Sequence, residues 1–184
     1  MTAHSSIFPS QAHRITVMQG QVKVSDDPQV ELTTVLGSCV ASCLFDAEAQ
    51  VGGMNHFLLA EPPSSHTHGV VDEHYGVYLM ELLINEMLKQ GALKSRLRAH
   101  LYGGANLRAG MMPIGSANAS FAVSFLENER IPLIHSDLGG TGARRLDFRP
   151  AQGKARCRVV ESTLVTETKP VARPVDSSGD VELF

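Results

Sequence analysis

The sequence lacks tryptophan and has few aromatic residues, three cysteines and no long apolar run among its 184 residues. Aromatic side chains make up 5% of the chain, too few for the stacking surfaces that bind single-stranded nucleic acid. No apolar stretch reaches the length of a membrane span, and the polar residues 1–11 lack the apolar core of a signal peptide. The net charge of −3 excludes a strongly basic nucleic-acid-binding protein. These absences predict a cytoplasmic protein that neither binds nucleic acid nor inserts into a membrane.

An odd and small number of cysteines argues against a disulfide framework and for a reducing compartment. The length suits one domain, and 43% hydrophobic residues suffice for its core. We expect a flexible arm over residues 1–13, a folded domain over 14–161 and a disordered tail over 162–184, because both ends are polar.

Hydrophobic periodicity predicts an α+β domain built from packed layers. Helices are expected over residues 74–90 and 116–129, where apolar residues recur at steps of three and four. Short β-prone runs flanked by turn residues predict three hairpins, over 15–24, 40–60 and 145–161, and further strands over 30–36, 97–102 and 133–136.

One predicted hairpin brings a cysteine and a histidine together. If residues 46–49 form its turn, Phe45 pairs with Gln50 and Cys39 lies opposite His56, within reach of its imidazole. A paired histidine lowers the pKa of a thiol, and the resulting thiolate can attack an amide or ester carbonyl. A slip of one residue in the register would put the two side chains on opposite faces. The competing interpretation is a buried structural cysteine, and the spacing alone slightly favours that interpretation.

Such a pair needs a third group that orients the imidazole. Thr33, Thr34 and Asn55 are the polar neighbours, and spacing does not choose among them. The other cysteines, Cys43 and Cys157, lie in apolar or hairpin segments and are expected to serve packing.

A metal site is the alternative use of these residues. His66, His68 and His74 could ligate zinc together with Cys39 or Asp72. No Cys-x-x-Cys or His-Glu-x-x-His pattern supports this, so we expect solvent-exposed loop histidines, no metal and no cofactor.

Two glycine pairs, 103–104 and 139–140, lack the Gly-Lys-Ser/Thr ending of phosphate-binding loops. They are expected to be turns near a site, where glycine permits another chain to approach closely.

Five short motifs occur together and in one order, over roughly residues 14–160. With them the sequence resembles the CheD family, the chemoreceptor glutamine deamidases of bacterial chemotaxis. The motifs are Leu36-Gly37-Ser38-Cys39-Val40, Gly52-Gly53-Met54-Asn55-His56-Phe57, Tyr102-Gly103-Gly104-Ala105, Ile114-Gly115 with Asn118, and Asp137-Leu138-Gly139-Gly140 with Arg144.

The resemblance implies layered β-sheets flanked by helices, similar to the fold of deamidase toxins. It implies a protein-glutamine glutaminase that converts receptor glutamines to glutamate and releases ammonia through a thioester. The nucleophile would be Cys39, the histidine His56, and the third residue Thr33, six positions before the cysteine. A methylesterase side activity is chemically allowed, since a glutamyl ester would form the same thioester.

Further contacts to substrate or to an oxyanion are expected from backbone and polar groups around the nucleophile: Gly37, Ser38, Asn55, Gly103, Gly104, Gly139 and Gly140. The partners implied by the resemblance are methyl-accepting chemotaxis receptors and, in some bacteria, a CheC-type phosphatase. A docking module without catalysis, which would bind the same partners, is the alternative function.

Overall fold

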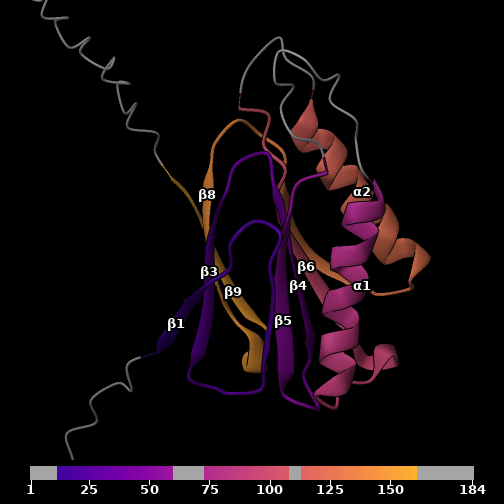
Figure 1. Ribbon diagram of the computed structural model, residues 1–184. Coiled ribbons are helices and arrows are strands. Elements are labelled where there is room, and N and C mark those ends of the chain that lie inside the picture. Colours follow the sequence, from indigo (N-terminus) through magenta and orange to yellow (C-terminus); the bar gives the residue numbers. More distant parts are fainter. Residues whose placement is uncertain (1–11, 60–72, 108–112, 161–184) are drawn as a thin grey trace, which may run out of the picture.

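The computed structural model describes residues 12–59, 73–107 and 113–160, which form two β-sheets and two α-helices (Figure 1). The four-stranded sheet has the order β1-β3-β8-β9, and the five-stranded sheet has the order β2-β5-β4-β6-β7. The strands are β1 (His13–Thr16), β2 (Val22–Ser25), β3 (Val30–Leu36), β4 (Val40–Asp46), β5 (Val51–Phe57), β6 (Arg98–Gly103), β7 (Leu133–Leu138), β8 (Arg144–Arg149) and β9 (Lys154–Val159). The helices are α1 (Glu73–Lys89) and α2 (Ile114–Asn128), with short 3-10 turns η1 (Lys94–Arg96) and η2 (Pro150–Gln152). The predicted α+β class with layered sheets is confirmed.

The molecule has three layers, with both helices on one face of the five-stranded sheet and the four-stranded sheet on the other (Figure 1). Side chains alternate between the faces of a strand, so a central strand serves two cores. In β4, Val40 and Leu44 pack toward the helices, whereas Ala41 and Cys43 pack between the sheets. Side chains on the inner side of β4 therefore face the four-stranded sheet.

The predicted hairpin over residues 15–24 is wrong. Strand β1 pairs in parallel with β3, while β2 pairs antiparallel with β5 in the other sheet. Ile15 packs into the core between the sheets, but Val22 and Val24 pack into the core beneath the helices. Because the two strands fill different cores, residues 17–21 carry the chain from one sheet to the other.

The β4–β5 hairpin is confirmed, but its register differs by two residues from the prediction. Asp46 pairs with Val51, so His56 lies opposite Ala41 and not opposite Cys39. The turn starts later because the Asp46 carboxylate accepts hydrogen bonds from the backbone N–H groups after it, at 3.0 and 3.1 Å. A shift of two keeps His56 on the face expected for Cys39, since side chains repeat every second residue.

The predicted tail over residues 162–184 and nearly all of the predicted arm over 1–13 lie outside the described residues. His13, the last residue assigned to the arm, is the first residue of β1. Within the described ranges, no helix is both long and apolar enough to cross a membrane.

Truncation of Phe148 should destabilise the protein strongly, because this side chain is fully buried between the sheets. Phe148→Ala should lower the free energy of unfolding by about 3–5 kcal/mol, measured by urea denaturation. Val35→Ala is the control: Val35 is 55% exposed on the outer face of β3, and its loss should change stability by less than about 0.5 kcal/mol. Equal losses in the two variants would contradict the layered arrangement.

Candidate active site

Cys39 and the two glycine pairs lie where β3, β6 and β7 end. These strand ends are at the upper end of the two sheets in Figure 1. Backbone hydrogen bonds join the segments there: Gly104 N–H donates to Cys39 at 2.8 Å and Ala105 N–H to Gly37 at 2.9 Å. Gly139 N–H donates to Gly103 at 2.9 Å, which links the second glycine pair to the first. The turn before β4 and both glycine segments therefore form one network of backbone contacts.

Cys39 is half-buried in the turn between β3 and β4, and the carbonyl groups around it are all engaged. The carbonyl of Ser38 accepts a hydrogen bond of 2.7 Å from the side-chain amide of Asn118, near the start of α2. Asn118 is fully buried, and its Oδ1 accepts a hydrogen bond of 3.0 Å from the N–H of Leu59. Asn118 thus ties the Cys39 turn to the chain that leaves β5 after His56.

The role of Asn118 was not predicted, although this residue belongs to a motif that carries the family resemblance. A buried asparagine near a helix start gives no sequence signal about which distant carbonyl it will bind. Only the packing of α2 against the β3–β4 turn determines that.

His56 points into the space between the sheets, where its Nδ1 lies 3.0 Å from Thr34 Oγ1 and 3.2 Å from the carbonyl oxygen of Val17. Thr34 donates its own hydroxyl hydrogen to the same Val17 carbonyl at 2.9 Å. A carbonyl oxygen only accepts, so Nδ1 must carry the ring hydrogen of the neutral imidazole. The lone pair then lies on Nε2, which is buried and has no hydrogen-bond partner among the described residues.

The predicted contact between Thr33 and His56 is wrong, because Thr34 occupies that position. Thr33 Oγ1 donates to Asp147 at 2.9 Å on the outer face of the four-stranded sheet. Neighbouring residues of a strand point to opposite faces, so only one of the two threonines can face the histidine. The register of β3 against β8 selects Thr34.

Asn55 does not belong to the site, contrary to the prediction. It follows the strand alternation and points toward the helices, fully buried. Its Oδ1 accepts from the N–H of Ser42 at 2.9 Å, and its Nδ2 donates to the carbonyl of Leu79 on α1 at 3.3 Å. Asn55 therefore links β4 and β5 to α1.

The glycines have two different roles. Gly103 has a φ of +107°, and a Cβ there would overlap the carbonyl oxygen of Cys39, so this position supports the nucleophile turn from behind. Gly104 is buried beside it and provides the N–H that binds Cys39. A Cβ on Gly139 would meet no atom within 4 Å, and its carbonyl accepts a hydrogen bond of 2.7 Å from Arg144. Gly103 and Gly104 are surrounded by other backbone segments, whereas the space beside Gly139 is open among the described residues. A contact with substrate therefore stays a prediction for the pair 139–140.

The electrostatic surroundings do not favour a resting ion pair of thiolate and imidazolium. Burial raises the pKa of the Cys39 thiol and lowers the pKa of His56, so both groups are neutral near pH 7. The Cys39 Sγ–H donates to the side-chain amide oxygen of Gln19 at 3.4 Å. This neighbour was not predicted; it lies in the segment that crosses between the sheets.

The other two cysteines are less available for chemistry. Cys43 is fully buried and burial raises its pKa well above the ordinary value; burial likewise raises the pKa of Cys157 to about 11. Both pack in the core between the sheets, as predicted.

Metal ligands do not cluster in the part of the chain that the structure describes: no three His, Cys, Asp or Glu side chains come together there. His74 is exposed in the first turn of α1, while His66, His68 and Asp72 lie outside the described residues.

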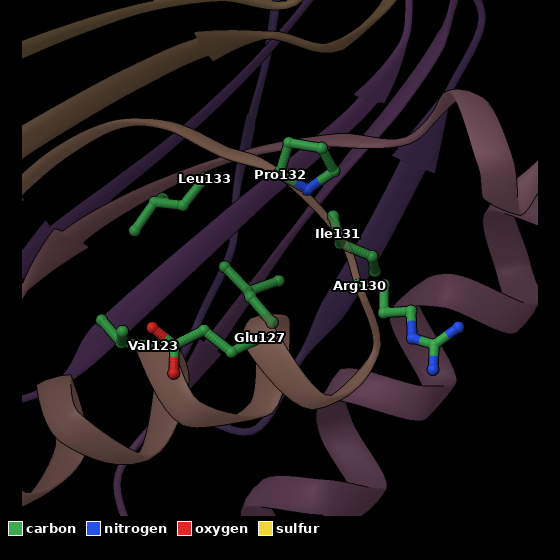
Figure 2. A pocket seen from close by; sticks show the side chains of 7 residues that line it. Val123, Glu127, Arg130, Ile131, Pro132 and Leu133 are labelled. Carbon is green, nitrogen blue, oxygen red and sulfur yellow. The ribbon is translucent and has the colours of Figure 1, made fainter.

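A surface hollow of about 350 Å³ lies between the last turns of α2 and the start of β7 (Figure 2). Val123, Glu127 and Leu133 line it, and none of the predicted site residues does. It lies near the C-terminal end of α2, whereas Asn118 and the nucleophile lie near its start.

The chain is similar in sequence to proteins of a known family. Residues 58–159 match the family described as CheD, chemotactic sensory transduction. The chain belongs to the CheD family. A CheD relative from Zymomonas mobilis is 54% identical over 171 residues, covering 93% of this chain and 92% of its own. One from Caulobacter vibrioides is 44% identical over the full length of both chains, and one from Agrobacterium fabrum is 46% identical over 94% of this chain and 97% of its own.

Each of these relatives is named a probable chemoreceptor glutamine deamidase CheD. The family match begins after Cys39 and His56, so the roles of these CheD residues rest on their geometry. Among solved structures, a Neisseria meningitidis protein of the DUF152 family has a TM-score of 0.44 and 12% identity over 65% of this chain and 53% of its own, too weak a likeness for a functional argument.

The alkylation rate of Cys39 by iodoacetamide should rise with pH through an apparent pKa above 9.0, the ordinary value of the thiol, because burial disfavours the thiolate. Cys39 should still react before Cys43 and Cys157, whose pKa values are also raised. Peptide mass spectrometry after timed labelling measures both. A rate that is already maximal at pH 7 would show a thiolate at rest and contradict the neutral pair.

Proposed function

We propose that this protein deamidates glutamine side chains of chemotaxis receptors through a thioester on Cys39. The observation that carries the proposal is the arrangement around His56: Thr34 and Val17 hold Nδ1, and the buried Nε2 has no hydrogen-bond partner among the described residues. A nucleophile, a base and a group that orients the base form the working unit of amide hydrolysis. Membership of the CheD family supports this reaction class.

The reaction starts from the neutral pair. Nε2 of His56 takes the thiol proton as the Cys39 sulfur attacks the amide carbon, so charge develops only with substrate in place. His56 then gives that proton to the leaving nitrogen, which departs as ammonia and leaves a thioester. In the second half, Nε2 removes a proton from water, and the resulting hydroxide attacks the thioester carbon. The C–S bond breaks, His56 gives its proton to the sulfur, and the new carboxyl group loses its proton to solvent as glutamate.

Backbone donors for the oxyanion are available at the turn itself. The carbonyls of Gly37, Ser38 and Cys39 accept hydrogen bonds from other segments, which fixes the turn. Within residues 12–59, 73–107 and 113–160, no acceptor in another residue binds the N–H of Ser38 or Cys39. One such donor is worth about 2.7–4 kcal/mol when it stabilises a tetrahedral intermediate.

The side chain of Gln19 lies beside Cys39 and carries a primary amide, the same group as the glutamine of the proposed substrate. Its amide oxygen accepts the thiol hydrogen of Cys39, so a receptor glutamine must displace this contact before attack. Gln19 is exposed, and no regular element holds it, which makes its displacement inexpensive.

A glutamyl methyl ester would form the same thioester and release methanol, so the site also accommodates methylesterase chemistry. A CheC-type phosphatase is a second partner in this proposal. Pure docking is the less favoured function, because it would need neither the Thr34–His56 contact nor the unpartnered Nε2.

Incubation with the cytoplasmic part of a chemoreceptor should convert defined glutamines to glutamate, with a gain of about 1 Da each and release of ammonia. Cys39→Ala should abolish the conversion while leaving the urea denaturation curve nearly unchanged, since Cys39 is only half-buried. Normal deamidation by Cys39→Ala would refute the thioester route, and no deamidation by the wild type would refute the function.

Replacement of Thr33 or Thr34 by isosteric valine tests which of the two threonines orients His56. Thr34→Val removes the hydroxyl that holds His56 and should lower kcat/KM by about fivefold, since a hydrogen bond is worth roughly 1 kcal/mol. Thr33→Val removes only the bond to Asp147, so kcat/KM should change by less than about twofold even if stability falls. A larger loss of activity in Thr33→Val, measured by ammonia release, would contradict the assignment.

A further inference from the structure

The outer face of the four-stranded sheet carries a dense group of cationic side chains. We call it the arginine face; its members are Arg14, Arg145, Arg149, Lys154, Arg156 and Arg158. They come from β1, β8 and β9, on the side of the molecule away from α1 and α2 (Figure 1). The arginine side chains remain between 46% and 60% exposed.

Among the described residues, two carboxylates pair with these cations, Asp147 and Glu31. Asp147 is 2% exposed and has four arginines within 4.0 Å, the nearest being Arg156 at 2.9 Å and Arg14 at 3.0 Å. Glu31 is 9% exposed and contacts Arg14 at 2.7 Å and Arg149 at 3.4 Å. The two carboxylates are nearly buried while the arginines are about half exposed, so the surface that the described residues form here is cationic.

The excess of positive charge is not explained by folding. The arginine face has six cations for two carboxylates, although the whole chain carries a net charge of −3. Exposed ion pairs contribute little to stability, and crowded like charges oppose it. Two arginines would be enough to neutralise the two carboxylates, so the other cations are in excess of the charge that they face.

The shape and composition of the surface suit another protein chain. Val35 is 55% exposed on the same face, opposite Arg145 in the strand register, so an apolar contact lies among the charges. A hollow of about 220 Å³ lies between Glu31, Asp147 and the side chains of Arg149, Lys154 and Arg156. Bidentate arginine contacts favour carboxylates, and nucleic acid would gain no stacking partner from the side chains of this face.

We propose that the arginine face binds an acidic surface of the receptor substrate, outside the glutamine that reacts. This inference rests on the proposed function and adds a docking contact to it. Strand β3 links the two surfaces, because Thr34 faces His56 on one side and Thr33 faces Asp147 on the other. One substrate chain can therefore contact the arginine face and reach over the end of the sheet to Cys39.

The test removes three outer charges and keeps the short ion pairs. The variant Arg145→Gln/Arg149→Gln/Arg158→Gln loses the longest contacts, at 3.9, 3.4 and 3.6 Å, while Arg14 and Arg156 still neutralise the carboxylates. The control Lys89→Gln/Lys94→Gln/Arg130→Gln changes the net charge equally on the helix side of the molecule. Deamidation of the receptor cytoplasmic part is measured for both.

The arginine variant should raise KM by about tenfold or more, keep kcat within about twofold and weaken the salt dependence of KM, while the control matches the wild type. Unchanged KM, or an equal rise in the control, would overturn the docking contact. Alkylation of Cys39 at an unchanged rate shows that the site is intact in the variant.

Direct binding separates this proposal from the proposed function. With Cys39→Ala as the common background, the receptor part should bind more weakly to the chain that carries the three glutamines, even if no deamidation occurs in the wild type. Equal binding of the receptor part by Cys39→Ala with and without the three glutamines would overturn the proposal. It would also be overturned if the three glutamines weakened binding only to anionic lipid vesicles or to RNA.

Discussion

Two sheets pack face to face, and side-chain alternation along β3 assigns each residue either to their interface or to the outer surface. Thr34 belongs to the interface, where its hydroxyl and the Val17 carbonyl hold one nitrogen of His56. Thr33 belongs to the outside, where it binds Asp147 beneath the arginine face. A slip of β3 by one residue would exchange these roles and remove the support of the imidazole. The register of a single strand therefore positions both the site and the surface behind it.

The nucleophile turn is fixed by backbone contacts from segments far apart in sequence. Gly104 and Ala105 follow β6 and bind the carbonyls of Cys39 and Gly37, while Asn118 reaches Ser38 from α2. Gly103 can approach so closely because it has no Cβ and adopts a positive φ. These contacts engage the carbonyls of the turn, and no other described residue accepts a hydrogen bond from the N–H groups of Ser38 and Cys39.

The neutral state of Cys39 and His56 follows from their burial, because desolvation disfavours the charged form of each group. Gln19 fits this arrangement, because its amide oxygen accepts a hydrogen bond from a thiol. Because the pKa of Cys39 is raised, we expect slow alkylation of this thiol at neutral pH.

Local patterns were enough to predict α1, α2 and the β4–β5 and β8–β9 hairpins, because hydrophobic periodicity and turn residues act over a few positions. They failed for residues 13–25. The local pattern identifies β1 and β2 as two short strands, but it does not show that each strand pairs in a different sheet. The register of β4 against β5 was missed by two residues because the Asp46 carboxylate accepts hydrogen bonds from the turn.

The sequence by itself determined the α+β class, the nucleophile and histidine candidates, and the family to which the chain belongs. Only the tertiary structure decided which threonine supports His56, that Asn55 faces α1, and that Asn118 and Gln19 contact the nucleophile segment. The physical reason is that composition and periodicity are local properties. Hydrogen bonds across stacked sheets depend on how distant strands are brought into register.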